Sequence, residues 1–108
     1  MISHIVLFRP RRDTTPDDRR AFVAALEDAF RQVPAIRRAV VGRSLPGDNG
    51  ADFPYVAVVE FDDERGLQQY LAHPLHVPVA RLFHHTCAAT TIVNAETMDA
   101  REPLSGLL

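Results

Sequence analysis

Residues 2–34 read ISHIVLFRPRRDTTPDDRRAFVAALEDAFRQVP, a strand pattern followed within a few residues by a helix pattern. Residues 2–8 carry apolar side chains on both faces, which is typical of a central strand that is covered on both sides. Pro10 ends this strand because proline has no amide hydrogen to donate to a sheet. The stretch therefore predicts a central strand that leads into a packed helix.

The predicted helix has sequence signals at both ends. Thr15 is a favourable N-cap residue, Pro16 suits the first helical position, and two aspartates follow at the positive end of the helix dipole. Pro34 ends the pattern. Apolar residues recur at helical spacing and predict one buried face: Phe22, Ala25, Leu26, Ala29, Phe30 and Val33.

The later patterns complete a sheet. Further strands are predicted at residues 36–45, 55–61 and 88–93. One further helix is expected to begin near Asp62, and a short one is expected over residues 77–85. Apart from the short helix, the order is β-α-β-β-α-β. This order is typical of the α+β class and of a ferredoxin-like protomer, in which helices cover one face of a four-stranded antiparallel sheet.

The second face of the sheet predicts a partner. The strands have apolar residues on both faces, and helices that lie on one side leave the other side uncovered. We therefore expect a homodimer, a dimeric α+β barrel in which a second copy covers the helix-free face, with Val59 or Phe61 on it, whichever points there. Residues 1–94 are expected to form the domain. Residues 95–108 form a C-terminal tail, and its packing on the dimer partner is a hypothesis.

The composition excludes several classes of function. The net charge is -2 and there is no basic stripe, which argues against a nucleic-acid partner. No apolar run is long enough to cross a membrane, and the first residues lack a signal-peptide pattern. The single cysteine, Cys87, cannot form an intrachain disulfide, which fits a reducing compartment. We therefore expect a cytoplasmic protein with no nucleic-acid or membrane partner.

The candidate site residues are His4 and the run Tyr70-Leu71-Ala72-His73-Pro74-Leu75-His76. The run places a phenol and two imidazoles around a helix end, because the residue before a proline avoids the helical conformation. The two-residue strand period places His4 on one face with Val6 and Phe8. A histidine on a core strand needs a hydrogen-bond partner or a cavity. These residues predict a polar site within an apolar interior.

These patterns resemble the stress-responsive A/B barrel (Dabb) family. The resemblance rests on the opening strand from Ile2 to Arg9, the Val41-Gly42 pair, the Val58-Val59-Glu60-Phe61 strand and, most specifically, the tyrosine–histidine–proline–histidine run. It covers roughly the first ninety residues. It implies a ferredoxin-like protomer, a homodimeric α+β barrel, and a small-molecule pocket between each protomer's sheet and its helices.

The resemblance also implies roles for individual residues. One plant branch, the olivetolic-acid-cyclase-like proteins, performs an intramolecular aldol cyclisation on a linear polyketide. The matching motif positions, His4, Tyr70 and His76, are implied to line the pocket. Val6 and Phe8, on the same strand face as His4, are expected to contact the substrate, and His73 is expected to have a structural part.

These residue types suit acid–base chemistry. Histidine titrates near neutral pH, so His76 is the candidate base that removes a proton next to a carbonyl. Tyrosine stays protonated, so Tyr70 is the candidate donor to the developing oxyanion. His4 would bind or orient the substrate. The leading hypothesis is a cyclase, isomerase or lyase that acts on a polyketide-like carbonyl compound and needs no cofactor.

Other interpretations of the same residues stay open. Tyr70 can be a core residue whose hydroxyl bonds a backbone carbonyl, and His73 can bond carbonyls at the helix end. The pocket can belong to a non-catalytic ligand-binding or stress-associated module, and a purely structural dimerisation domain would have no pocket. Neighbouring His84 and His85 would point about 100° apart on a helix, so no metal site is predicted, and no haem motif is present.

Overall fold

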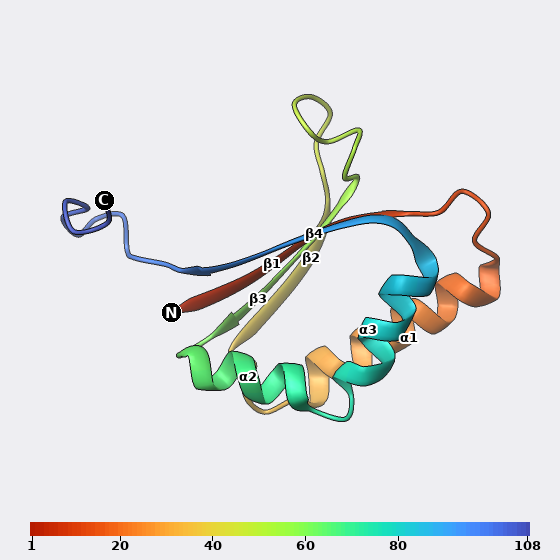
Figure 1. Ribbon diagram of the computed structural model, residues 1–108, viewed down its shortest axis with the longest axis horizontal. Helices are drawn as coiled ribbons and strands as arrows, with labels where there is room; N and C mark the ends of the chain where they lie inside the picture. The colour runs from red at the N-terminus through yellow and green to blue at the C-terminus, as the bar shows by residue number, and fades with distance from the viewer.

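The computed structural model describes residues 1–108 and shows one antiparallel sheet with its helices on one face (Figure 1). The elements follow in the order β1 (Ile2–Pro10), α1 (Pro16–Gln32), β2 (Arg38–Arg43), β3 (Tyr55–Phe61), α2 (Glu64–Ala72), α3 (His76–Thr86) and β4 (Cys87–Glu96). The strand order in the sheet is β2-β3-β1-β4. The ferredoxin-like α+β fold is confirmed, and β1 is a central strand as its sequence predicts.

Local side-chain bonds fix the helix ends that the sequence predicts. The Thr15 hydroxyl accepts a hydrogen bond from the Asp18 amide at 3.1 Å, and the Asp18 carboxylate accepts one from the Thr15 amide at 3.2 Å. These reciprocal bonds form a capping box at the start of α1. The carboxylate of Asp63 caps α2 by accepting from the Gly66 amide at 2.9 Å. At the other end of α2, His73 leaves the helix in an extended conformation.

The hydrophobic core lies between the sheet and the helices. The apolar face of α1 supplies Phe22, Ala25, Leu26 and Ala29, as the helical spacing predicts. Val59 and Phe61 of β3 are 1% and 0% exposed and belong to this core. Neither side chain therefore lies on the helix-free face, where one of them was expected. None of the helices is both long and apolar enough to cross a membrane.

The helix-free face carries its own apolar stripe. In the ladders, Ile5 is paired with Val58 and with Val93, and Val40 is paired with Val58. Because side chains alternate between the faces of a strand, these residues point away from the buried side that carries Val59. Val40 and Val93 are 42% and 50% exposed. The protomer alone therefore leaves apolar surface uncovered on this face.

Two strand boundaries differ from the predicted ones. β2 is shorter than the predicted 36–45, and β4 is longer than the predicted 88–93, running from Cys87 to Glu96. The Thr97 amide also donates to the Met1 carbonyl at 2.9 Å. Residues 95 and 96, which the sequence places in the tail, are therefore part of the sheet. Pairing along the whole of β1 extends β4 beyond its apolar centre.

Candidate active site

A cavity of about 210 Å³ lies between the sheet and helices α2 and α3. His4 from β1, Tyr70 from α2 and His76 from the first position of α3 all line it. Most of the remaining wall is apolar and includes Val6 and Val79. The structure therefore brings three of the polar residues singled out in the sequence to one cavity, with an apolar surrounding.

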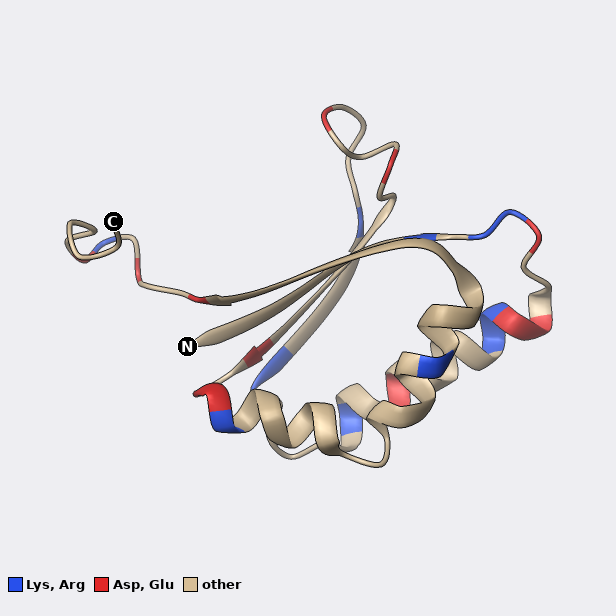
Figure 2. Ribbon diagram, viewed as in Figure 1, with Lys and Arg blue, Asp and Glu red and all other residues tan.

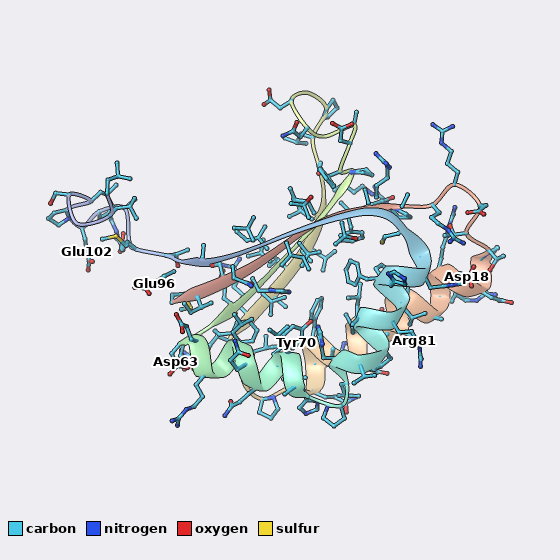
Figure 3. The ribbon with its side chains drawn as sticks, viewed as in Figure 1. Asp18, Asp63, Tyr70, Arg81, Glu96 and Glu102 are labelled. Carbon is cyan, nitrogen blue, oxygen red and sulfur yellow. The ribbon has the colours of Figure 1, made fainter.

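The Tyr70 ring contacts both imidazoles of the cavity. Its centroid lies 5.9 Å from that of His4 and 4.8 Å from that of His76, and the interplanar angles are 67° and 69°. Both contacts are edge-to-face, a favourable arrangement of aromatic rings. Figure 3 shows the Tyr70 side chain extending from the helical layer towards the sheet. Tyr70 as a whole is only 2% exposed, so packing fixes the position of its ring.

The Tyr70 hydroxyl has no hydrogen-bond partner within the chain. The hydroxyl oxygen is nevertheless partly accessible. Thr86 Oγ1 is the only side-chain nitrogen or oxygen that is both fully enclosed and without a hydrogen-bond partner. The hydroxyl is therefore open to the cavity, and the alternative in which a backbone carbonyl satisfies it is not observed. Burial raises the pKa of Tyr70 to about 12. At neutral pH the cavity thus contains a protonated phenol that is free to donate.

His76 is held in its neutral form. Burial lowers the pKa of His76, the nearby His4 lowers it further, and the backbone of Leu71 opposes these effects. His76 follows the break after α2, where its own amide donates to the His73 carbonyl at 2.9 Å. This turn brings the imidazole back towards Tyr70. A neutral imidazole at pH 7 retains the lone pair that a general base needs.

His4 is oriented by a residue that the sequence analysis did not identify. Its Nδ1 lies 2.6 Å from Oδ1 of Asn94, its partner on β4 in the β1–β4 ladder. From this bond we assign the proton of neutral His4 to Nδ1, which leaves Nε2 as the acceptor. Asn94 lies at the end of the predicted strand pattern, and only the register of β4 against β1 identifies it.

The other expected site residues divide between the cavity and its surroundings. Val6 lines the cavity with His4. Phe8 does not line it; its ring packs edge-to-face on Phe83 at 5.1 Å and faces a different cavity. Phe8 was expected to contact the substrate together with His4 and Val6, but in the structure it does not line the cavity that contains His4. His73 also lies outside, and its Nδ1 accepts from the Leu75 amide at 3.1 Å, a bond that fixes the turn before α3.

The remaining histidines lie away from the cavity. His85 is 3.6 Å from the Asp18 carboxylate, across the contact between α3 and α1, and His84 is exposed. The structure gathers no three histidine, cysteine, aspartate or glutamate side chains in a group that could hold a metal ion. The polar side chains that line the candidate site are two imidazoles, a phenol and the hydroxyl of Thr90, and the amide of Asn94 bonds His4 from outside the lining.

The sequence as a whole matches a known family. Residues 2–97 match the model of the stress responsive A/B barrel domain, Dabb. This chain belongs to the Dabb family. The match includes all four strands and all three helices.

Solved structures share this Dabb fold. A dimeric ferredoxin-like protein of unknown function from Thermobifida fusca is 26% identical, with a TM-score of 0.73, and the alignment covers 89% of this chain and 90% of that one. A Dabb family protein from Mesorhizobium loti is 16% identical, with a TM-score of 0.75 and coverage of 91% and 97%. Hydroxynitrile lyase from Passiflora edulis is 17% identical, with a TM-score of 0.76 and coverage of 91% and 96%. The comparison with curated proteins finds no match.

Proposed function

We propose that this Dabb protein is a cofactor-independent enzyme that transfers a proton on a small carbonyl compound bound between His4, Tyr70 and His76. The observation that carries the proposal is the unpartnered Tyr70 hydroxyl, which faces the cavity between two imidazoles. Because this hydroxyl has no partner in the chain and is not sealed off, it is free to donate to the oxygen of a ligand in the cavity. Cyclisation, isomerisation and lyase reactions of carbonyl compounds all use such a donor.

The roles follow from the protonation states. His76, neutral because burial lowers its pKa, is the proposed base that removes a proton next to the carbonyl. Tyr70, whose raised pKa keeps it protonated, donates to the oxygen on which negative charge develops. His4, oriented by Asn94, binds or orients the substrate through Nε2. General acid–base catalysis of this kind typically contributes about 10²- to 10⁴-fold.

The cavity restricts the class of substrate. Its volume of about 210 Å³ is below the roughly 300–1,000 Å³ typical of sites for drug-sized ligands. Its wall is mainly apolar, so we propose a small carbonyl compound with an apolar substituent, such as a short polyketide-like 1,3-dicarbonyl. The hydroxynitrile lyase of Passiflora edulis supports the idea that this fold can host lyase chemistry, although the fold alone is shared with it.

The experiment is a screen of 1,3-dicarbonyl and β-polyketide compounds for turnover by the wild type. A positive reaction is then repeated with His76→Ala, Tyr70→Phe and His4→Ala, with His84→Ala as the matched control on the exposed side of α3. We expect His76→Ala to abolish turnover and His4→Ala mainly to raise KM. Full activity of His76→Ala would refute the base assignment. Ligand binding without turnover across the panel would favour the non-catalytic ligand-binding or stress-associated module instead.

We further propose that the protein is a homodimer. The support is the uncovered apolar stripe on the helix-free face, together with the dimeric state in the name of the Thermobifida fusca relative. A second copy placed sheet to sheet would cover Val40, Val58 and Val93. In the tail, Leu104 and Leu107 are 45% and 58% exposed, and we propose that they pack on the partner. A cytoplasmic location remains a prediction that rests on the single free cysteine.

A further inference from the structure

A second and larger cavity, of about 550 Å³, lies between α1 and the end of the sheet where β1 leaves it. None of the residues proposed for proton transfer lines it. The two cavities are separated by an aromatic contact: Phe8 lines the larger one, Phe83 lines the smaller one, and their ring centroids are 5.1 Å apart. The larger cavity is therefore a distinct space with its own chemistry.

One side of this cavity is apolar and rigid. Phe8 contacts Phe22 edge-to-face at 5.8 Å and stacks on Tyr55 at 5.6 Å. Phe8 and Phe22 are 4% and 6% exposed, and Leu26 adds an aliphatic surface beside them. Packed aromatic rings of this kind form a preorganised surface for the apolar body of a ligand.

The other side carries four arginines and no acidic residue. Arg9, Arg11 and Arg12 come from the end of β1 and its connection to α1, and Arg19 comes from α1 itself. Figure 2 shows the basic residues along this connection. Arg11 pairs with the exposed Asp13 at 3.3 Å, and Arg12 has no ion-pair or side-chain hydrogen-bond partner. The chain has a net charge of -2, so this local cluster of guanidinium groups is unusual, and it favours the binding of an anion.

A buried hydroxyl lies beneath the arginine segment. Thr86 is 1% exposed, lines the cavity, and has an Oγ1 with no hydrogen-bond partner. The Arg11 amide donates to the Thr86 carbonyl at 2.8 Å, so the hydroxyl is held close to the basic segment. Because this oxygen has no accessible surface, a ligand in the cavity cannot bond it. The polar contacts of a bound anion must therefore come from the arginines.

We propose that this cavity is a second ligand site, which binds a small carboxylic acid with an apolar body. The carboxylate accepts hydrogen bonds from Arg12 and Arg19, and the apolar body packs on Phe8 and Phe22. Guanidinium groups match a carboxylate in geometry as well as charge, because they can donate two parallel hydrogen bonds. Arg19 already donates from Nε to a threonine hydroxyl, which leaves its terminal N–H groups for the ligand.

The test uses octanoate as the probe and octanamide as its uncharged counterpart, with binding followed by calorimetry and by ¹⁵N-resolved NMR. We expect octanoate to bind at least about tenfold more tightly than octanamide, because charge-assisted bonds are the stronger ones. Amide shifts should change in Arg9, Arg11, Arg12 and residues 19–26. Equal affinities for the two probes, or shift changes centred on residues 70–80, would overturn the proposal.

Three variants separate ligand binding from folding. Arg12→Gln should weaken octanoate binding about tenfold without loss of stability, because the exposed Arg12 has no partner in the free protein. Arg19→Gln should also weaken octanoate binding, because it removes the second guanidinium group of the site. The control Arg81→Gln, on the exposed side of α3, should change neither. Unchanged octanoate affinity in both Arg12→Gln and Arg19→Gln would refute the site.

Discussion

The imidazole of His4 and the amide of Asn94 join the first and last strands of the sheet, with 2.6 Å between Nδ1 and Oδ1. The two residues are opposite each other in the antiparallel ladder of β1 and β4. Because Oδ1 can only accept, Nδ1 carries the proton of neutral His4 and Nε2 remains an acceptor. Asn94 is thus a positioning residue for a group that lines the candidate active site.

The first prediction concerns this bond. Asn94→Ala should convert the single Nδ1–H tautomer of neutral His4 into a mixture, and it should cost about 1 kcal/mol of stability, the usual value of one such hydrogen bond. Long-range ¹⁵N–¹H NMR of the histidine ring reports the tautomer directly. Thr91→Ala, on the opposite face of β4, is the matched control. The same tautomer in wild type and Asn94→Ala would contradict the assignment.

Tyr70→Phe separates the hydroxyl from the ring. The ring contacts remain, and the hydroxyl has no partner to lose, so the free energy of unfolding should change by less than about 0.5 kcal/mol. If the protein is the proposed enzyme, turnover should fall roughly 10²- to 10³-fold, the effect of removing a well-placed oxyanion donor. Chemical denaturation and steady-state rates give the two values. A large loss of stability would indicate a hidden structural bond of the hydroxyl.

The lowered pKa of His76 predicts a pH dependence of stability. Between the folded pKa and the unfolded value of about 6.5, the unfolded chain binds more protons at this position than the native protein does. The free energy of unfolding should therefore be highest above that unfolded value and should fall as the pH is lowered through the folded pKa. His76→Gln should flatten this part of the profile, and His84→Gln should not. Urea denaturation between pH 4 and pH 8 provides the comparison, at roughly half-unit steps that span the ordinary histidine range.

A charged side chain introduced on the helix-free face should disrupt the proposed dimer. Val58→Asp should place a carboxylate in the centre of the sheet-to-sheet contact and dissociate the dimer. Val77→Asp is the control, because Val77 is 61% exposed on α3, outside this face. Sedimentation velocity at micromolar concentration measures both variants. A folded, monodisperse wild-type monomer under these conditions would remove the argument for a dimer.

The tail can be tested by deletion of residues 98–108. Backbone hydrogen bonds beyond Thr97 join only residues within that segment, so the protomer fold should survive the deletion unchanged. If the exposed leucines pack on a partner, the dissociation constant of the dimer should rise. Circular dichroism checks the fold, and a dilution series in the ultracentrifuge measures the constant. An unaltered constant would assign the tail no part in assembly.

The sequence predicts the elements of this fold well because their signals are local. The start of α1 is set by Thr15 and Pro16, and the end of α2 by the proline after His73, all visible in a few consecutive residues. The two-residue period of β1 puts His4 and Val6 on one face, and both side chains are buried in the structure. These features depend on the side chain and its near neighbours in the chain, which is the information that a single sequence contains.

Features that depend on pairing between distant segments were not predictable. The direction of Val59 is set by the register of β3 against β1, where it faces His4. Asn94 becomes part of the site only through the register of β4. Phe8 shares the strand face of His4 but lies four residues further along β1. There its ring contacts Phe83, and this contact separates the two cavities. No periodicity within one element determines these relationships.

The position of β4 at the edge of the sheet has a consequence for biosynthesis. A ribosome makes His4 on β1 before any of the helices, yet the strand that carries its partner Asn94 is translated after the other six elements of the domain. Until β4 leaves the exit tunnel, β1 of the nascent chain has only β3 as a neighbour, and the amide that selects the tautomer of His4 is missing. Translation that stops short of β4 would therefore yield a polypeptide that has all three ring side chains of the site but cannot set the proton on one of them.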